Sequence, residues 1–174
     1  MSKRGTYAVR ISGLGEGDHE FSFELDRQFF ESFEHPEIEN GNVRAEVSLE
    51  KKPGVFSLHF TLTGEVEVKC DRCLEGFMTD ISTNQSIFVK MGEDPGEIED
   101  DVLMIHRDDH EIEVGQLMYE FIILALPYTK IHPEEGESTC DPEMLKRLDA
   151  HSLKETEEED KSDPRWDALK GIIE

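Results

Sequence analysis

The sequence predicts an α+β fold: an antiparallel, meander-like β-sheet with a few packed helices and an acidic C-terminal tail. Apolar and polar residues alternate through much of the stretch between residues 7 and 91, as in half-buried strands. One later segment, Val114–Leu126, instead carries apolar residues at i, i+3, i+4 and i+7, which predicts the strongest helix of the chain. A formal net charge of −23 over 174 residues places many carboxylates on the surface or in an extended segment.

Two short alternating segments open the chain. Tyr7–Ile11 and Phe21–Leu25 are separated by a glycine-rich stretch, and we expect them to pair with each other as strands. Asp26 then stands where an N-cap is needed, and Phe29, Phe30 and Phe33 follow it at helical spacing. The sequence therefore predicts a short helix that ends at Phe33.

The clearest hairpin joins strands at 43–49 and 56–62 through the turn Lys52-Pro53-Gly54. Gly64 permits a bulge or bend before a second hairpin. In that hairpin the alternation of Val66 and Val68 runs into a Cys-x-x-Cys turn, and alternation resumes from Phe77 to Met91. The turn thus connects two strands of the predicted sheet.

The cysteines of this turn, Cys70 and Cys73, allow three interpretations. A redox pair normally has its first sulfur at a helix N-terminus, which lowers the thiol pKa, but no helical pattern follows Cys73. A pair in a β-turn resembles half of a structural zinc site, for which Cys140 and His132 are the available further ligands. Alternatively, the cysteines are reduced and pack as small apolar residues. If these residues hold a cofactor, the sequence indicates structural zinc.

Residues 93–113 are rich in carboxylates and are expected to form a solvated loop around one short buried strand, Val102–Ile105. The acids do not have the spacing of an EF-hand. In the following helix, Ile123, Leu124 and Leu126 widen the apolar stripe beyond one face. This helix is therefore either sandwiched in the core or leaves an exposed patch for a partner.

We expect the chain to consist of three segments. Residues 1–132 are expected to form a single domain with a β-rich first half. Residues 133–162 resemble an acidic linker, with a short helix at 142–150 capped by Asp141. Residues 163–174 are expected to form a docking helix, which carries the only tryptophan, Trp166.

Composition excludes several classes of protein. No apolar run approaches the roughly 20 residues of a membrane helix, so we expect a cytoplasmic protein without membrane contact. Three cysteines do not make a secreted disulfide framework. The negative charge disfavours contact with bare nucleic acid, which depends on counterion release, and favours a basic protein partner.

Three stretches occur in a specific order: Cys70-Asp71-Arg72-Cys73-Leu74-Glu75-Gly76-Phe77, then after an acidic gap Glu120-Phe121-Ile122-Ile123-Leu124-Ala125-Leu126-Pro127, and finally Asp163-Pro164-Arg165-Trp166 with Leu169-Lys170. This order resembles the YceD family of large ribosomal RNA subunit accumulation proteins, best over residues 65–174. The resemblance implies a non-enzymatic role in accumulation of the large-subunit ribosomal RNA and in assembly of that subunit. Many relatives carry a second cysteine pair after the Leu-Ala-Leu-Pro stretch, where this chain has only Cys140.

We therefore expect a binding factor, not an enzyme. Its partner would be a basic ribosomal protein or an assembly intermediate, with ribosomal RNA contacted indirectly. The residues expected to bind the partner are Arg72, Glu120, Leu124, Leu126, Pro127, Trp166 and Leu169.

Two other functions remain open. The first is a thiol or zinc-dependent enzyme centred on Cys70 and Cys73, although the sequence offers no glutamate–histidine metal motif, phosphate loop or Ser-His-Asp candidate. The second, an acidic mimic of nucleic acid, depends on net charge alone.

Overall fold

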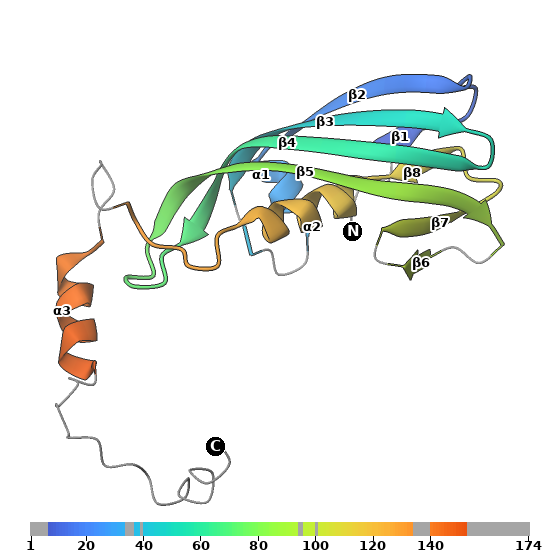
Figure 1. Cartoon of the computed structure of the whole chain (residues 1–174). Helices are drawn as coiled ribbons and strands as arrows, with labels where there is room; N and C mark the ends of the chain where they lie inside the picture. Colours follow the sequence, from blue (N-terminus) through green and yellow to red (C-terminus); the bar gives the residue numbers. More distant parts are fainter. Residues whose placement is uncertain are drawn as a thin grey trace, which may run out of the picture.

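Long antiparallel strands form the main layer of the protein. The computed structural model describes residues 7–33, 37–38, 40–93, 96–99, 101–133 and 140–152 (Figure 1). In chain order the elements are β1 (Ala8–Arg10), β2 (Gly17–Leu25), α1 (Arg27–Phe30), β3 (Gly41–Lys52), β4 (Val55–Lys69), β5 (Gly76–Gly92), β6 (Gly96–Glu99), β7 (Val102–His106), β8 (Glu111–Glu113), α2 (Gly115–Ala125) and α3 (Pro142–His151). A six-stranded sheet has the order β2-β3-β4-β5-β7-β6, and β1 and β8 form a second sheet. The predicted α+β class is confirmed.

One face of the large sheet carries the core. The register places Val47 opposite Phe60 and Leu49 opposite Leu58, and all four side chains are buried. Helix α2 packs on this face through Phe121, whose ring centroid lies 5.2 Å from that of Phe60. Alternation along β3 and β4 therefore generates the buried layer, as the period of two predicts.

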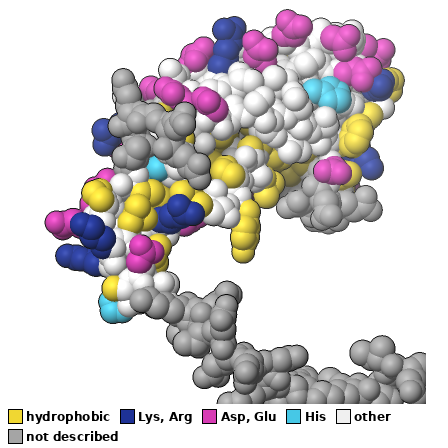
Figure 2. All heavy atoms as spheres, turned by 60° about the vertical axis from the view of Figure 1, so that its left-hand side comes forward, with side chains coloured by type: hydrophobic (Ala, Val, Ile, Leu, Met, Phe, Trp, Pro, Cys, Tyr) yellow, Lys and Arg dark blue, Asp and Glu magenta, His cyan; other side chains and the backbone are white. Residues whose placement is uncertain are grey.

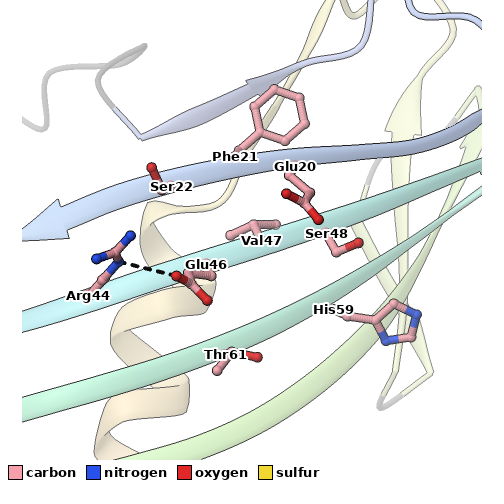
Figure 3. A pocket seen from close by; sticks show the side chains of 9 residues that line it. All are labelled: Glu20, Phe21, Ser22, Arg44, Glu46, Val47, Ser48, His59 and Thr61. Carbon is pink, nitrogen blue, oxygen red and sulfur yellow. Dashed lines mark ion pairs between the residues drawn. The ribbon is translucent and has the colours of Figure 1, made fainter.

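The opposite face of the sheet is polar. Figure 3 shows Ser48, His59 and Thr61 among the side chains that line a hollow of about 480 Å³ there, on the far side of the strands from α2. His59 Nδ1 lies 2.8 Å from Ser86 Oγ, and Arg44 forms an ion pair with Glu46 at 3.2 Å. These contacts join side chains within the face.

Strand β1 does not pair with β2, so the predicted pairing of Tyr7–Ile11 with Phe21–Leu25 is wrong. Strand β1 pairs with β8, where Val9 faces Ile112 and both are buried. Strand β2 pairs with β3 instead, along its whole length from Gly17 to Leu25. The buried pair Val9–Ile112 shows why β1 lies with β8: each short strand buries its one central apolar side chain against the other.

The acidic stretch at 93–113 is not simply a loop, because it contains β6, β7 and β8. The strand predicted at Val102–Ile105 is present as β7, but it runs parallel to β5. Strand β6 reverses the chain first and pairs antiparallel with β7. This reversal gives β7 the direction of β5, so the antiparallel meander ends at β5.

The helices begin where their caps predict. Asp26 Oδ1 accepts hydrogen bonds from the backbone N–H groups of Gln28 and Phe29, although α1 ends at Phe30 and not at Phe33. Asp141 accepts from Glu143 N at 2.9 Å and caps α3. In the residues that the structure describes, no helix combines the length and apolarity that a membrane crossing requires.

Helix α2 combines the two alternatives left open by its wide apolar stripe. Met118 and Ile122 are fully buried against the sheet. Leu124, in contrast, is 75% exposed, while Ile123 is half-buried. One side of the helix is thus part of the core and the other is an exposed patch.

Gly64 stands inside β4 without a bulge, since the pairing runs unbroken from Thr63 to Glu65. A side chain is excluded there because an added Cβ would overlap the carbonyl oxygen of Asn42 and lie 2.7 Å from Cα of Val43. Of the bulge or bend that Gly64 permits, the bulge does not form, and the glycine allows a close approach of two backbones.

Replacing Gly64 with Ala should lower the free energy of unfolding by about 2 kcal/mol or more, because β3 and β4 must move apart. Gly15→Ala is the matched control, since a Cβ at Gly15 meets no heavy atom within 4 Å. Urea denaturation measures both variants. Equal urea midpoints for the two variants would contradict the close approach of β3 and β4 at Gly64.

Candidate metal centre

A tight turn at the end of the β4–β5 hairpin presents Cys70 and Cys73. Cys70 N donates to Glu75 O, and Leu74 N donates to Cys70 O, both at 2.9 Å. Leu74 adopts a φ of 66°, which closes the turn. The N–H group of Arg72 lies 3.4 Å from Cys70 Sγ, so the turn backbone donates toward the sulfur.

The segment after α2 is fastened to this turn by two backbone contacts of Lys130. Asp71 N donates to Lys130 O, and Lys130 N donates to Asp71 Oδ2, each at 2.7 Å. Two residues later, His132 lies against the ring of Phe77, with centroids 4.7 Å apart. His132 is buried, and the Asp71–Lys130 contacts two residues earlier hold its segment beside the cysteines.

Four potential ligand atoms meet at this point, and we call Cys70, Cys73, His132 and Cys140 the Cys/His cluster. Its ligand atoms all lie within 4.8 Å of one another. His132 Nδ1 lies 3.4 Å from Cys73 Sγ and 3.5 Å from Cys140 Sγ, and Cys70 Sγ lies 3.6 Å from Cys140 Sγ. Tetrahedral zinc, with Zn–S about 2.3 Å and Zn–N about 2.0 Å, requires S–S edges of about 3.8 Å and S–N edges of about 3.5 Å. The donor set and these three edges fit zinc.

The thiols of the cluster differ in acidity. Burial raises the pKa of Cys70, but hydrogen bonds from the backbone of Cys73, Arg72 and His132 outweigh it and lower the pKa to about 6. Burial and the neighbouring sulfurs raise the pKa of Cys140 to about 11. Near neutral pH Cys70 is therefore a thiolate and Cys140 a thiol.

This acidity corrects one expectation from the sequence. Strand β5 follows the turn, as expected, but the low pKa of Cys70 arises without a helix because the turn and His132 supply the hydrogen-bond donors. Cys70 is 0% exposed, so a substrate disulfide cannot reach its sulfur. A thiolate in a closed site has the properties of a metal ligand and not of a redox nucleophile.

A comparison with protein families identifies the chain. The family model of the large ribosomal RNA subunit accumulation protein YceD matches residues 58–172, which include the whole Cys/His cluster. The chain belongs to the YceD family. The family name links the protein to accumulation of the large-subunit ribosomal RNA. No curated protein matches the chain, and no solved structure does.

The partner-binding residues expected in this YceD protein are spread over two described surfaces. Arg72 is exposed at the turn of the cluster, whereas Glu120 and Leu124 are exposed on α2. Just after α2, Leu126 is half-buried and Pro127 exposed. Trp166 and Leu169, with the proposed docking helix, lie outside the described residues.

Sequence reasoning missed the residues that join these two surfaces. Lys130 Nζ pairs with Glu37 Oε1 at 3.0 Å, and Glu37 N donates to Tyr119 Oη at 2.9 Å. Asp71, which holds Lys130, is part of the Cys-x-x-Cys turn, and its place in that motif was the only available signal.

The metal-free protein should become more stable as pH rises from about 6 toward 9, because the Cys70 thiol is more acidic in the folded than in the unfolded chain. This contribution is lost as pH falls through about 6. Above pH 9 the trend reverses, since the pKa of Cys140 is raised on folding. Urea midpoints measured with chelator at several pH values test this against Cys70→Ala, which should lack the rise. Identical pH profiles would contradict the low pKa.

Proposed function

We propose that this YceD protein is a non-enzymatic factor for large-subunit ribosomal RNA accumulation and ribosome assembly, and that it acts by binding a basic ribosomal protein or assembly intermediate. Family membership supports the ribosomal role. The formal charge of −23 supports a basic partner, because the average field attracts Lys- and Arg-rich chains and repels phosphate. Contact with ribosomal RNA is then indirect.

We propose further that the Cys/His cluster holds a structural zinc ion. The cluster offers four protein donors, as many as a tetrahedral zinc ion takes, so a bound ion would have no open position for water or substrate. The ligands come from three separate segments: the β4–β5 turn, the chain after α2 and the residue before the cap of α3. Zinc supplies folding energy at such a site by holding these segments together. This donor geometry supports a structural centre over the thiol or zinc-enzyme alternative.

Protein purified without chelator should contain about one equivalent of zinc by elemental analysis. His132→Ala should reduce the zinc content and lower the thermal midpoint, since it removes one of the four donors. His59→Ala is the matched control, because His59 lies exposed on the polar face of the sheet. A zinc content below about a tenth of an equivalent in the unmodified protein would leave the cysteines as packing residues.

Partner selection requires more than charge. Screening over about 8 Å at physiological salt limits the range of the acidic field, so charge gives fast but unselective association. We assign selectivity to the exposed side of α2, which carries Leu124, and to Trp166, the only tryptophan of the sequence.

The protein should bind basic proteins of the large subunit more tightly than it binds naked large-subunit RNA. Surface-immobilised protein, tested against both kinds of ligand, measures the difference. Raising the salt concentration should mainly slow association, and Trp166→Ala should weaken binding without unfolding the sheet. Tight, salt-sensitive binding to the RNA with none to the proteins would contradict the proposed function.

A further inference from the structure

The exposed side of α2 is a ridge formed by Gln116, Glu120 and Leu124, at positions i, i+4 and i+8. Figure 2 shows hydrophobic side chains gathered on the lower flank of the domain, where α2 lies in Figure 1, while acidic side chains crowd the upper rim. Leu124, at the end of the ridge, is one of the most exposed large apolar side chains that the structure describes. Single exposed leucines are common, so only the surroundings of Leu124 can show whether it belongs to a binding surface.

Two apolar hollows flank this ridge. The large hollow, of about 430 Å³, is lined by Glu37, Gln116, Tyr119, Glu120, Ile123 and Leu124. The small hollow, of about 190 Å³, lies on the other side of the ridge and includes Leu103, Leu117 and Phe121. A volume of about 150 Å³ accommodates a benzene-sized group, so each hollow can hold an apolar side chain. Glu120 and Leu124 belong to both hollows.

The charged groups around both hollows are carboxylates. Glu37 and Glu120 line the large hollow, and Asp101 and Glu120 line the small one. Glu37 is paired with Lys130. Glu120 accepts a hydrogen bond from Gln116 at 2.7 Å, and the ion pairs among the described residues include neither Glu120 nor Asp101. An occupant that brings cations beside its apolar groups would complement this rim.

We infer that the ridge and its two hollows are the docking site for a Lys/Arg-rich polypeptide segment whose apolar side chains enter the hollows. The apolar lining anchors the segment, and the rim carboxylates pair with its basic residues. A second copy of this chain fits poorly, because two chains of charge −23 repel each other. Ribosomal RNA fits poorly too, since its phosphates would meet Glu120 and Asp101. The inference depends on the proposed binding function and names the kind of segment that the α2 surface holds.

The large hollow is held in shape before any partner binds. Tyr119 stacks on Phe33 with centroids 4.1 Å apart and accepts a hydrogen bond from Glu37 N. Lys130 holds the side chain of Glu37. A wall fixed in this way loses little conformational entropy on docking, which favours affinity.

The test uses the full-length protein and, as probe, the RNA-free protein mixture from purified large ribosomal subunits. A photo-crosslinking residue at position 124 should capture peptides in which Lys or Arg flanks apolar residues, whereas the same residue at position 61, on the polar face, should not. Leu124→Ser should weaken retention of the captured protein about tenfold, because a buried leucine contributes to binding. Glu120→Gln should reduce the salt dependence of binding.

Matched variants separate this site from general effects. Leu148→Ser makes the same change at an exposed leucine of α3, and Glu20→Gln removes a carboxylate from the polar face. Both should bind like the unmodified protein. If basic proteins are retained equally by Leu124→Ser and Leu148→Ser, the inference is overturned together with the assignment of selectivity to α2, while the binding of a basic ribosomal partner stands.

Three other outcomes would also overturn the inference. Retention of no subunit protein by the unmodified chain would remove the proposed function along with the docking site. Cross-linking of position 124 to ribosomal RNA, in a parallel reaction with intact subunits, would assign the ridge to nucleic acid. A dimer in solution that Leu124→Ser dissociates would assign it to a second copy of this chain.

Discussion

The register of the β4–β5 hairpin is the constraint on which both the core and the Cys/His cluster depend. Pairing runs without a shift from Val55 opposite Lys90 to Lys69 opposite Gly76. Val68 faces Phe77 in the last inward apolar pair before the turn, and Cys70 follows Val68 in the same phase. A slip by one residue would turn every side chain of one strand to the opposite face. The apolar pattern that builds the sheet therefore also points the first sulfur inward.

The turn then determines what the sulfurs can do. Backbone donors stabilise negative charge on Cys70, although burial alone would oppose it. Burial also removes Cys70 and Cys73 from solvent, so the charge has no access to an external electrophile. Thiol redox chemistry needs a cysteine that is both acidic and accessible. The low pKa of Cys70 meets the first requirement, but its burial does not meet the second. Both properties suit a metal ligand, which must be deprotonated and is protected by burial.

Local features of this fold could be predicted from the sequence, and distant pairings could not. Asp26 and Asp141 cap their helices because a cap acts within three residues, and the Pro53-Gly54 turn fixes a hairpin in the same local way. The pairing of Val9 with Ile112 joins three-residue strands far apart in the chain, and alternation does not encode the partner. Cys140 and His132 could be paired with the turn because the sequence has only one further cysteine and His132 is the histidine nearest to it. Lys130 was missed since its contacts to Asp71 use its backbone, which any residue has.

The Cys/His cluster and the α2 ridge belong to one connected scaffold. Asp71, inside the Cys-x-x-Cys turn, holds the backbone of Lys130, and the ammonium of Lys130 holds Glu37. Glu37 in turn donates from its backbone to Tyr119, which lines the large hollow. Lys130 therefore has two structural tasks, which explains why its side chain is only 22% exposed although lysine usually extends into solvent. An interaction that orders the segment around His132 therefore also orders one wall of the large hollow, because Lys130 contacts both.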